Sequence, residues 1–134
     1  MKEILNIPMG MACLAYDRCR RRVGRVSFMR SIGVQVTTGT RFYDDSRHMF
    51  GSGPWMISIG RNCKIATDVQ FPVHDGGTTV LRKVQPDLEW AAPIDIGDDV
   101  FVDFRSIIFP EGKVGNRSII GAESIVNRDI RTTL

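Results

Sequence analysis

The sequence predicts an all-β fold in which short parallel strands wind around a three-sided prism, a parallel β-helix. From residue 96 onward an apolar residue recurs at every sixth position, and the residue after it is often glycine. A period of six is neither the 3.6 residues of an α-helix nor the simple alternation of a β-strand. It fits a short strand and a tight turn, so that three units make one coil of about eighteen residues. The repeated apolar residues are Ile96, Val102, Ile108, Val114, Ile120 and Val126.

A second series of small or β-branched residues lies four positions after the first. We expect inward side chains to stack on their equivalents one coil later, with about 4.8 Å between coils. Ile96 should therefore lie over Val114, and Val102 over Ile120. A register held over this length argues against a β-sandwich, the alternative fold for evenly spaced strands. The second series comprises Cys63, Val69, Val100, Ser106, Gly112, Ser118, Ser124 and Ile130.

The chain is expected to form a single domain. The six-residue step also occurs at Ile59, Ile65 and Phe71, and the register then breaks in a stretch rich in proline, glycine and charged residues. Such a composition is typical of a loop, and a long loop on a regular scaffold usually carries function. The expected segments are an N-terminal cap with a helix (1–22), β-helix coils (23–71 and 94–130) and an active-site loop (72–93).

Composition excludes several classes of protein. The chain is 43% hydrophobic and 25% charged, which is ordinary for a globular domain. It contains no apolar run of the roughly 20 residues that span a membrane. Residues 1–10 lack the features of a secretory signal, so we expect a cytoplasmic location. The arginines at residues 18–22 fit a solvated helix face, and no pattern of interleaved aromatic and basic residues indicates nucleic-acid binding.

Cysteine and histidine usage argues against a metal site. The three cysteines form no CxxC pair, and the chain has two histidines, His48 and His74. A zinc enzyme of the carbonic-anhydrase type needs three histidine ligands. We therefore expect no metal requirement.

Two stretches resemble the hexapeptide-repeat acyltransferases. Residues 94–130, IDIGDDVFVDFRSIIFPEGKVGNRSIIGAESIVNRDI, resemble the closing coils of that family. Residues 56–77, MISIGRNCKIATDVQFPVHDGG, are similar to the coil and loop that carry its catalytic histidine. The HDGG run is similar to that of capsular-polysaccharide and related sugar O-acetyltransferases. The resemblance covers about residues 20–130 and implies a left-handed parallel β-helix.

The resemblance also implies an activity and an assembly. It implies an acetyl-CoA-dependent O-acetyltransferase that modifies a hydroxyl of a sugar or polysaccharide precursor. The family is trimeric, with active sites between neighbouring prisms, so a homotrimer is expected. An amino-sugar N-acetyltransferase shares the fold and the base, and it stays open as an alternative. A non-catalytic trimeric scaffold is the other alternative.

The resemblance places the acceptor side of the site in the loop. His74 matches the catalytic histidine of the family. Asp75 could orient the imidazole, although Asp-Gly-Gly is also ordinary turn chemistry. Arg82 and Trp90 are candidates for binding the acceptor, with a salt bridge and packing between subunits as equally good explanations.

The donor side falls on the closing coils. Phe101 stands where the family often has a tryptophan beside the cofactor. Ala122 matches a residue whose backbone faces the pantetheine arm, and Asn127 and Arg128 match residues near the nucleotide end. Phe104 replaces a small residue of the family and would crowd the thioester, which favours the scaffold alternative.

Two further departures concern a corner and the last coil. The family has a Pro-Gly turn where Pro110 and Glu111 stand. Family members usually continue past the final coil into a proline-rich segment. Without that segment the last coil would expose unpaired strand edges unless a partner covered them.

The expected chemistry is direct transfer of the acetyl group. An alcohol is a poor nucleophile at neutral pH, and a histidine side chain can accept its proton in this pH range. His74 would take the hydroxyl proton during attack on the thioester and return it to the departing CoA thiolate. A base of this kind contributes about 10²- to 10⁴-fold in rate.

Overall fold

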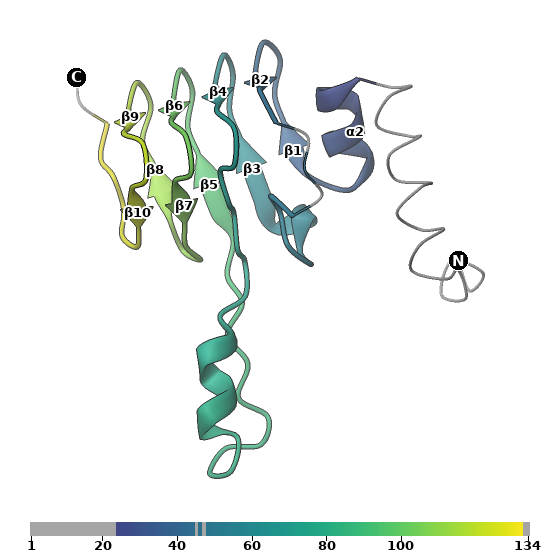
Figure 1. The fold of residues 1–134 in the computed structure, drawn as a ribbon, viewed down its shortest axis with the longest axis vertical. Coiled ribbons are helices and arrows are strands. Elements are labelled where there is room, and N and C mark those ends of the chain that lie inside the picture. Colours follow the sequence, from purple (N-terminus) through teal and green to yellow (C-terminus); the bar gives the residue numbers. More distant parts are fainter. Residues whose placement is uncertain (1–23, 45, 47, 133–134) are drawn as a thin grey trace.

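The computed structural model describes residues 24–44, 46 and 48–132. They form a stack of coils with a helix at the N-terminal end and a long loop that projects from one side (Figure 1). The helix is α2 (Arg25–Ser31), and two 3₁₀ helices follow it, η2 (Pro54–Met56) and η3 (Gly76–Leu81). The strands are β1 (Gln35–Val36), β2 (Arg41–Phe42), β3 (Ile57–Ile59), β4 (Lys64–Ile65), β5 (Ile94–Ile96), β6 (Phe101–Val102), β7 (Ile107–Ile108), β8 (Lys113–Val114), β9 (Ile119–Ile120) and β10 (Ile125–Val126).

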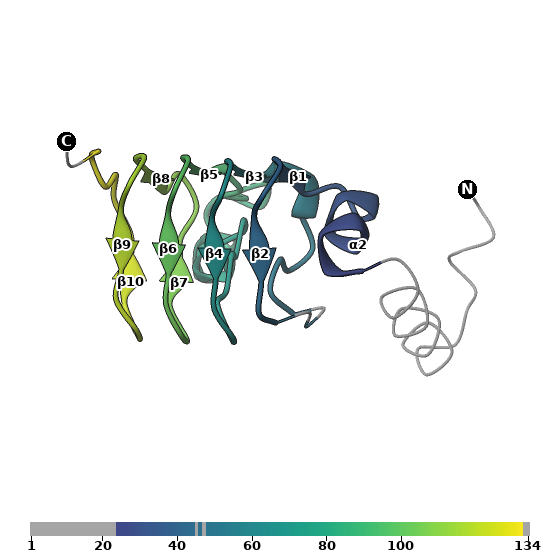
Figure 2. The same cartoon turned by 90° about the horizontal axis from the view of Figure 1, so that it is seen from above.

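The strands form three parallel sheets, one for each side of the prism (Figure 2). The first sheet has the order β1-β3-β5-β8, the second β2-β4-β6-β9, and the third pairs β10 with β7. A parallel bridge between Gln70 and Ile107 extends the third sheet by one coil. In the closing coils Ile96 pairs with Val114, and β6 pairs with β9 in the register that the six-residue repeat predicts. The predicted all-β parallel helix is confirmed.

Each coil turns at three corners. The first corner lies between the first and second sheets, the second corner between the second and third sheets, and the third corner leads back to the first sheet. The loop of residues 72–93 follows the third-sheet position of its coil and precedes β5 of the first sheet, so it leaves the prism at the third corner. The coils comprise residues 34–56 (coil 1), 57–93 (coil 2), 94–111 (coil 3) and 112–129 (coil 4).

Both repeated series point into the prism and form its core. Val102 and Ile108 are fully buried, and so is the polar side chain of Ser106. The Ser106 hydroxyl donates a hydrogen bond to the Gly121 carbonyl (2.8 Å) and accepts one from the Ser124 N–H (3.3 Å). A buried hydroxyl is tolerated when its hydrogen bonds are made, so serine can stand beside aliphatic residues inside the prism.

The corners place non-glycine residues in the left-handed region of backbone space. Seven such residues occur in the described part of the chain, with φ between 53° and 66°. This conformation costs an L-residue about 1–2 kcal/mol. Glu111, at a position where the resemblance predicts glycine, is one of them with φ of 66°. All seven are corner residues: Asn62, Asp68, Asp99, Arg105, Glu111, Arg117 and Glu123.

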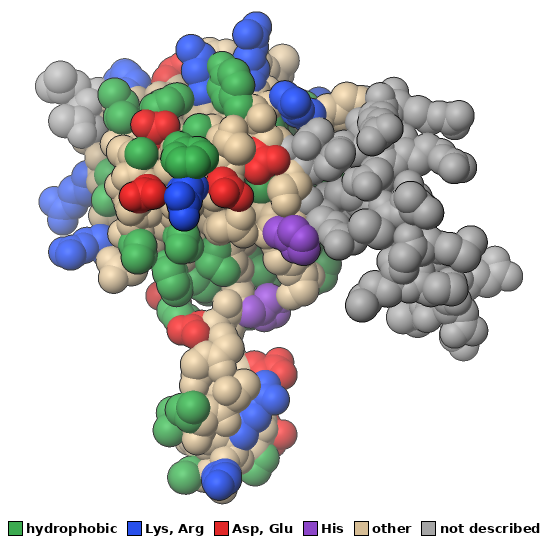
Figure 3. Space-filling view, in the orientation of Figure 1, with side chains coloured by type: hydrophobic (Ala, Val, Ile, Leu, Met, Phe, Trp, Pro, Cys, Tyr) green, Lys and Arg blue, Asp and Glu red, His purple; other side chains and the backbone are tan. Residues whose placement is uncertain are grey.

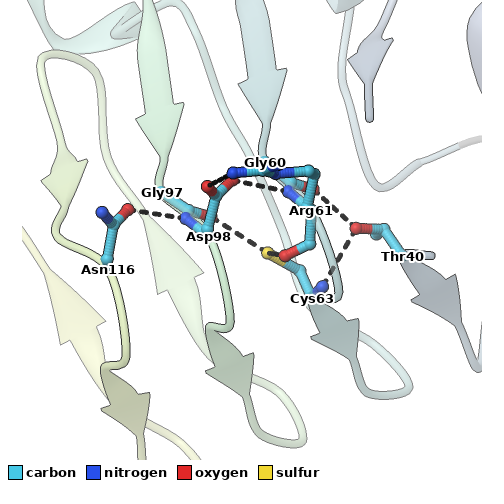
Figure 4. A network of polar contacts seen from close by, with 7 residues as sticks. All are labelled: Thr40, Gly60, Arg61, Cys63, Gly97, Asp98 and Asn116. Carbon is cyan, nitrogen blue, oxygen red and sulfur yellow. Dashed lines mark hydrogen bonds and ion pairs between the residues drawn. The ribbon is translucent and has the colours of Figure 1, made fainter. Parts of the chain in front are cut away.

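A chain of hydrogen bonds at the first corner ties three coils together (Figure 4). The Asp98 N–H donates to Asn116 Oδ1 at 2.7 Å. The Asp98 carboxylate in turn accepts from the Arg61 N–H (2.8 Å) and from Arg61 Nη2 (3.0 Å). These hydrogen bonds to Arg61 hold the pKa of the Asp98 carboxyl below its ordinary value. Asp98 therefore has a structural role at this corner.

The same corner carries a second, buried set of contacts. Thr40 Oγ1 donates to the Gly60 carbonyl (2.6 Å) and accepts from the Cys63 N–H (3.0 Å). The Cys63 thiol donates to the Gly97 carbonyl at 3.0 Å (Figure 4). Burial raises the pKa of this thiol above its ordinary value, which agrees with a structural role.

The N-terminal boundary of the coils differs from the prediction. Coils were expected from residue 23, but residues 25–31 form α2, and the first strand begins at Gln35. Phe28 and Met29 of α2 are buried at the open end of the prism, and the Val34 N–H donates to the Met29 carbonyl (3.1 Å). A helix with an apolar face can cover the end of the core, which a further open coil would leave exposed. The helix expected within residues 1–22 lies outside the described residues.

Candidate active site at the base of the projecting loop

His74 lies where the projecting loop leaves the prism. Its neighbour Val73 is buried, whereas the His74 side chain is exposed. His74 forms an antiparallel bridge with Ala91, and the Ala92 N–H donates to the Val73 carbonyl (3.0 Å). The Asp75 N–H donates to the Trp90 carbonyl at 3.1 Å. These bonds form a two-stranded neck, which holds the imidazole at a defined position on the third corner.

The Asp75 carboxylate caps the 3₁₀ helix of the loop. Its Oδ1 accepts a hydrogen bond from the Gly77 N–H at 2.8 Å, and its backbone carbonyl accepts one from the Thr78 hydroxyl (3.2 Å). Asp75 is the N-cap residue of η3. Of the two roles considered for Asp75, the structure supports the turn role.

Trp90 and Arg82 occupy different parts of the loop. The Trp90 carbonyl accepts the hydrogen bond from the Asp75 N–H, so Trp90 lies in the neck beside His74, and its side chain is partly exposed. Arg82 follows η3, and its Nη2 lies 3.4 Å from Glu89 Oε1, with both side chains exposed. The loop forms a lobe that stands apart from the prism (Figure 3). The structure therefore brings Trp90, but not Arg82, into the neck with His74.

The expected donor residues lie at two corners. Asn127 and Arg128 follow β10 at the third corner of coil 4, on the same edge of the prism as His74 in coil 2. A separation of two coils corresponds to about 10 Å. Phe104 and Ala122 lie instead at the second corner of coils 3 and 4, and Phe101 points outward from β6. Within one protomer the expected site residues thus form two groups.

The second corner carries a partly covered aromatic ring. The Arg105 guanidinium lies 5.6 Å from the centroid of the Phe104 ring and 3.5 Å from Glu123 Oε1. The Glu123 N–H donates to the Phe104 carbonyl at 2.8 Å, which stacks coil 4 beneath it. The Phe104 side chain is exposed at this corner, where the family resemblance predicts a small residue.

A shallow hollow on coil 4 connects the second and third corners. Its volume is about 230 Å³, and Asn127 and Arg128 contribute to its wall. Ile119 and Ile125 also line it, and they are 78% and 64% exposed. These two exposed β-branched side chains lie on adjacent sheets, Ile119 on the second and Ile125 on the third.

Gly53, at the end of the irregular segment of coil 1, lies against His74. A Cβ built on Gly53 would be 3.4 Å from His74 Nε2. The repeat pattern does not predict this contact, because Gly53 and His74 belong to two interruptions of the repeat and lie 21 positions apart in the chain.

The described residues contain neither a metal-ligand cluster nor a membrane-spanning helix. No group of three or more histidine, cysteine, aspartate or glutamate side chains within this part of the chain is arranged to hold a metal ion. None of its helices has the length and hydropathy needed to cross a membrane.

Comparison with known proteins identifies relatives in sequence, although no protein-family model matches the chain. The chain is 42% identical over 82 residues to protein CapG of Staphylococcus aureus, an alignment that covers 61% of this chain and 48% of the relative. It is 32% identical over 101 residues to the galactoside O-acetyltransferase of Escherichia coli K12, covering 75% of this chain and 48% of the relative. The chain therefore spans about half the length of each relative.

Solved structures of acetyltransferases are also similar to the chain. A galactoside acetyltransferase in complex with coenzyme A matches with a TM-score of 0.56 and 26% identity, covering 80% of this chain and 62% of that chain. A hexapeptide-repeat-containing acetyltransferase of Vibrio cholerae has a TM-score of 0.58 at 18% identity, covering 91% and 80%, and shows the fold alone. By sequence and by fold, the chain belongs to the hexapeptide-repeat acyltransferase family, whose members are left-handed parallel β-helices.

Proposed function

We propose that the protein is an acetyl-CoA-dependent O-acetyltransferase that modifies a hydroxyl of a sugar or polysaccharide precursor. The observation that carries this proposal is the position of His74. Its exposed imidazole is held by the neck of the loop, on the same edge of the prism as Asn127 and Arg128. The names of the relatives, which include a galactoside O-acetyltransferase, support the substrate class.

In the proposed reaction His74 acts as the general base. Its imidazole accepts the proton of the acceptor hydroxyl while the oxygen attacks the acetyl carbonyl carbon of acetyl-CoA. The carbon–sulfur bond then breaks, and the imidazolium returns the proton to the CoA thiolate. Trp90, whose exposed side chain belongs to the same neck, is the proposed apolar contact for the acceptor.

The donor would bind along coils 3 and 4. Asn127 and Arg128 line the hollow on coil 4, and an arginine can pair with the phosphates of CoA. The coenzyme A complex of the matched galactoside acetyltransferase supports a CoA-type donor. No step of this proposal requires a metal.

We also propose that the active protein is a cytoplasmic homotrimer. The outward residues of the first sheet are polar, whereas those of the other two sheets become apolar in coils 3 and 4. Apposition of two such surfaces from neighbouring copies would join the group at the second corner to the group at the third corner. The polar outward residues are Gln35, Ser58, Asp95 and Lys113, and the apolar ones are Phe101, Ile107, Ile119 and Ile125.

One observation favours a non-catalytic trimeric scaffold as a second candidate. Phe104 and Arg105 occupy the second corner, where a thioester would approach the backbone. If the ring crowds the donor, Phe104→Ala should tighten CoA binding several-fold, as measured by calorimetry. Weaker binding by the variant would contradict crowding.

The proposed activity is tested by following CoA release from acetyl-CoA in the presence of a panel of mono- and oligosaccharides. Saturable, acceptor-dependent release supports the enzyme. The absence of both release and saturable CoA binding would support the scaffold. The oligomeric state is measured separately by light scattering.

A further inference from the structure

The imidazole of His74 rests against a segment of the chain that is inserted into a different coil. Strand β1 pairs with β3 at an offset of 23 residues, five more than the offset between β5 and β8. The additional residues belong to the irregular part of coil 1, which ends at Gly53 and η2. This part of the chain brings the Gly53 backbone alongside the neck of the loop.

Gly53 is required for close approach rather than for a left-handed backbone. Its φ of −129° lies outside the left-handed region that favours glycine. A Cβ at this position would, however, overlap Cγ2 of the buried Val73, while lying 3.4 Å from His74 Nε2. The absence of a side chain therefore leaves room for the Val73 methyl group, whereas the imidazole would be in ordinary contact with a Cβ.

The segment that carries Gly53 is anchored in the core. The Phe50 and Phe71 rings stack with their centroids 5.5 Å apart, and both side chains are buried. The Phe71 N–H donates to the Met49 carbonyl at 2.6 Å. The Met56 N–H donates to the Gly53 carbonyl at 3.0 Å, which closes η2 after it. An added side chain at Gly53 would have to displace Val73, and any movement of Val73 would carry the adjacent His74 with it.

We propose that Gly53 is a positioning residue, which determines where the His74 imidazole lies by acting through Val73. This inference rests on the proposed function, in which His74 is the general base. The Asp75 carboxylate is engaged with the Gly77 N–H, so packing takes the place of a carboxylate partner in placing the ring. The nitrogen of the base must lie about 2.6–3.2 Å from the oxygen whose proton it accepts, and an error of about 1 Å can cost 100-fold in rate.

The test compares Gly53→Ala with a control variant on another edge of the prism. At Gly60, in the first corner, a Cβ would overlap Asp98 Oδ1 and the Gly97 backbone carbonyl, so Gly60→Ala introduces a larger steric conflict away from His74. We expect Gly53→Ala to lower kcat about tenfold or more, with KM for acetyl-CoA within about twofold of the parent. Gly60→Ala should keep kcat within about twofold at a temperature where both variants are folded. Equal kcat in the two variants would overturn the inference.

A double variant tests whether the effect of Gly53→Ala on kcat passes through Val73. Recovery of kcat would also show that misfolding is not the cause of the loss. In Gly53→Ala/Val73→Ala the Cγ2 atom that the new Cβ overlaps is gone. The double variant should recover most of the lost kcat, because the conflict passes through Val73. A double variant that is folded and as slow as Gly53→Ala would contradict action through Val73.

A measurement that does not depend on turnover separates this inference from the proposed function. The chain has two histidines, so His74→Ala assigns both imidazole Cε1–H resonances by NMR at one fixed pH. Gly53→Ala should shift the His74 resonance and leave that of His48 unchanged, and Gly60→Ala should shift neither. An unshifted His74 resonance in Gly53→Ala would contradict the inference. Absence of acetyl transfer by the parent would instead contradict the proposed function alone.

Discussion

The regular closing coils and the two interrupted coils contribute different things to the molecule. In coils 3 and 4 neighbouring strands pair at an offset of 18 residues on all three sheets. In coils 1 and 2 the offsets are 23 and 37, and the extra residues contain Gly53 and His74. The repeat builds the scaffold, and its two interruptions meet at the proposed catalytic base.

Removing the His74 imidazole should abolish the activity proposed for the interrupted coils while leaving the stability of the scaffold unchanged. His74→Ala should lower acetyl transfer at least about 100-fold, since a general base contributes 10²- to 10⁴-fold. The side chain is exposed, so thermal stability and oligomeric state should not change. His48→Ala, which removes the other exposed histidine, is the matched control and should keep its activity. Unchanged turnover in His74→Ala would remove this residue from the mechanism.

Truncation of a core side chain should have the opposite effect, lowering stability while leaving activity unchanged. Ile108 is fully buried in the third sheet, and Ile108→Ala should lower the free energy of unfolding by about 2–5 kcal/mol. Urea denaturation measures the effect, and Ile108→Val should cost about 0.5–1.5 kcal/mol as the graded control. At a temperature where the protein is folded, kcat should stay close to that of the parent. A loss below 1 kcal/mol for the alanine variant would mean that this position does not lie in a packed stack.

A corner substitution should stabilise the regular coils. Glu111 has φ of 66°, so Glu111→Gly removes the strain of a left-handed L-residue. We expect the free energy of unfolding to rise by about 0.5–1 kcal/mol after the entropic cost of glycine. Lys113→Gly, in the adjacent strand β8, should lower it by a similar amount because that position is extended. Destabilisation by Glu111→Gly would show that the Glu111 side chain makes a contact that outweighs the strain.

The smallest expected effect is a pH dependence of the contribution that Asp98, at the first corner, makes to stability. The pKa of Asp98 is lowered in the folded protein by its hydrogen bonds to Arg61. The ionised carboxylate therefore stabilises the fold fully above the ordinary value of about 3.9, and this contribution is lost as the pH falls through the lower folded value. The difference in thermal midpoint between the parent and Asp98→Ala should be constant above about pH 5 and shrink below about pH 4. A difference that did not vary with pH would contradict the linkage.

Much of the scaffold was predictable because the repeat is local. An inward apolar residue every six positions requires a strand and a turn at each step, and the pairs Ile96–Val114 and Val102–Ile120 follow from counting along the chain. The place of the loop was predictable for the same reason, since residues 72–93 are where the register and the composition change together. The helix α2 was missed because an end cap follows no repeat.

The site was only partly predictable. The sequence indicated His74 and Trp90, which the neck of the loop brings together. It left two roles open for Asp75, and the capping bond to Gly77 favours the turn role. The salt bridge considered for Arg82 is present with Glu89. The roles of Asp75 and Arg82 depend on which partner lies nearer in space. The spacing of residues along the sequence does not contain that information.

By itself, the sequence determined the prism, its register and the segment in which the histidine lies, because these depend on periodicity and on the chemistry of single residues. The tertiary structure decided how the two interruptions meet. The contact of Gly53 with Val73 and His74 exists only after coil 1 has stacked on coil 2. It follows from close packing between segments that share no repeat, and such packing is a property of the folded chain rather than of any stretch within it.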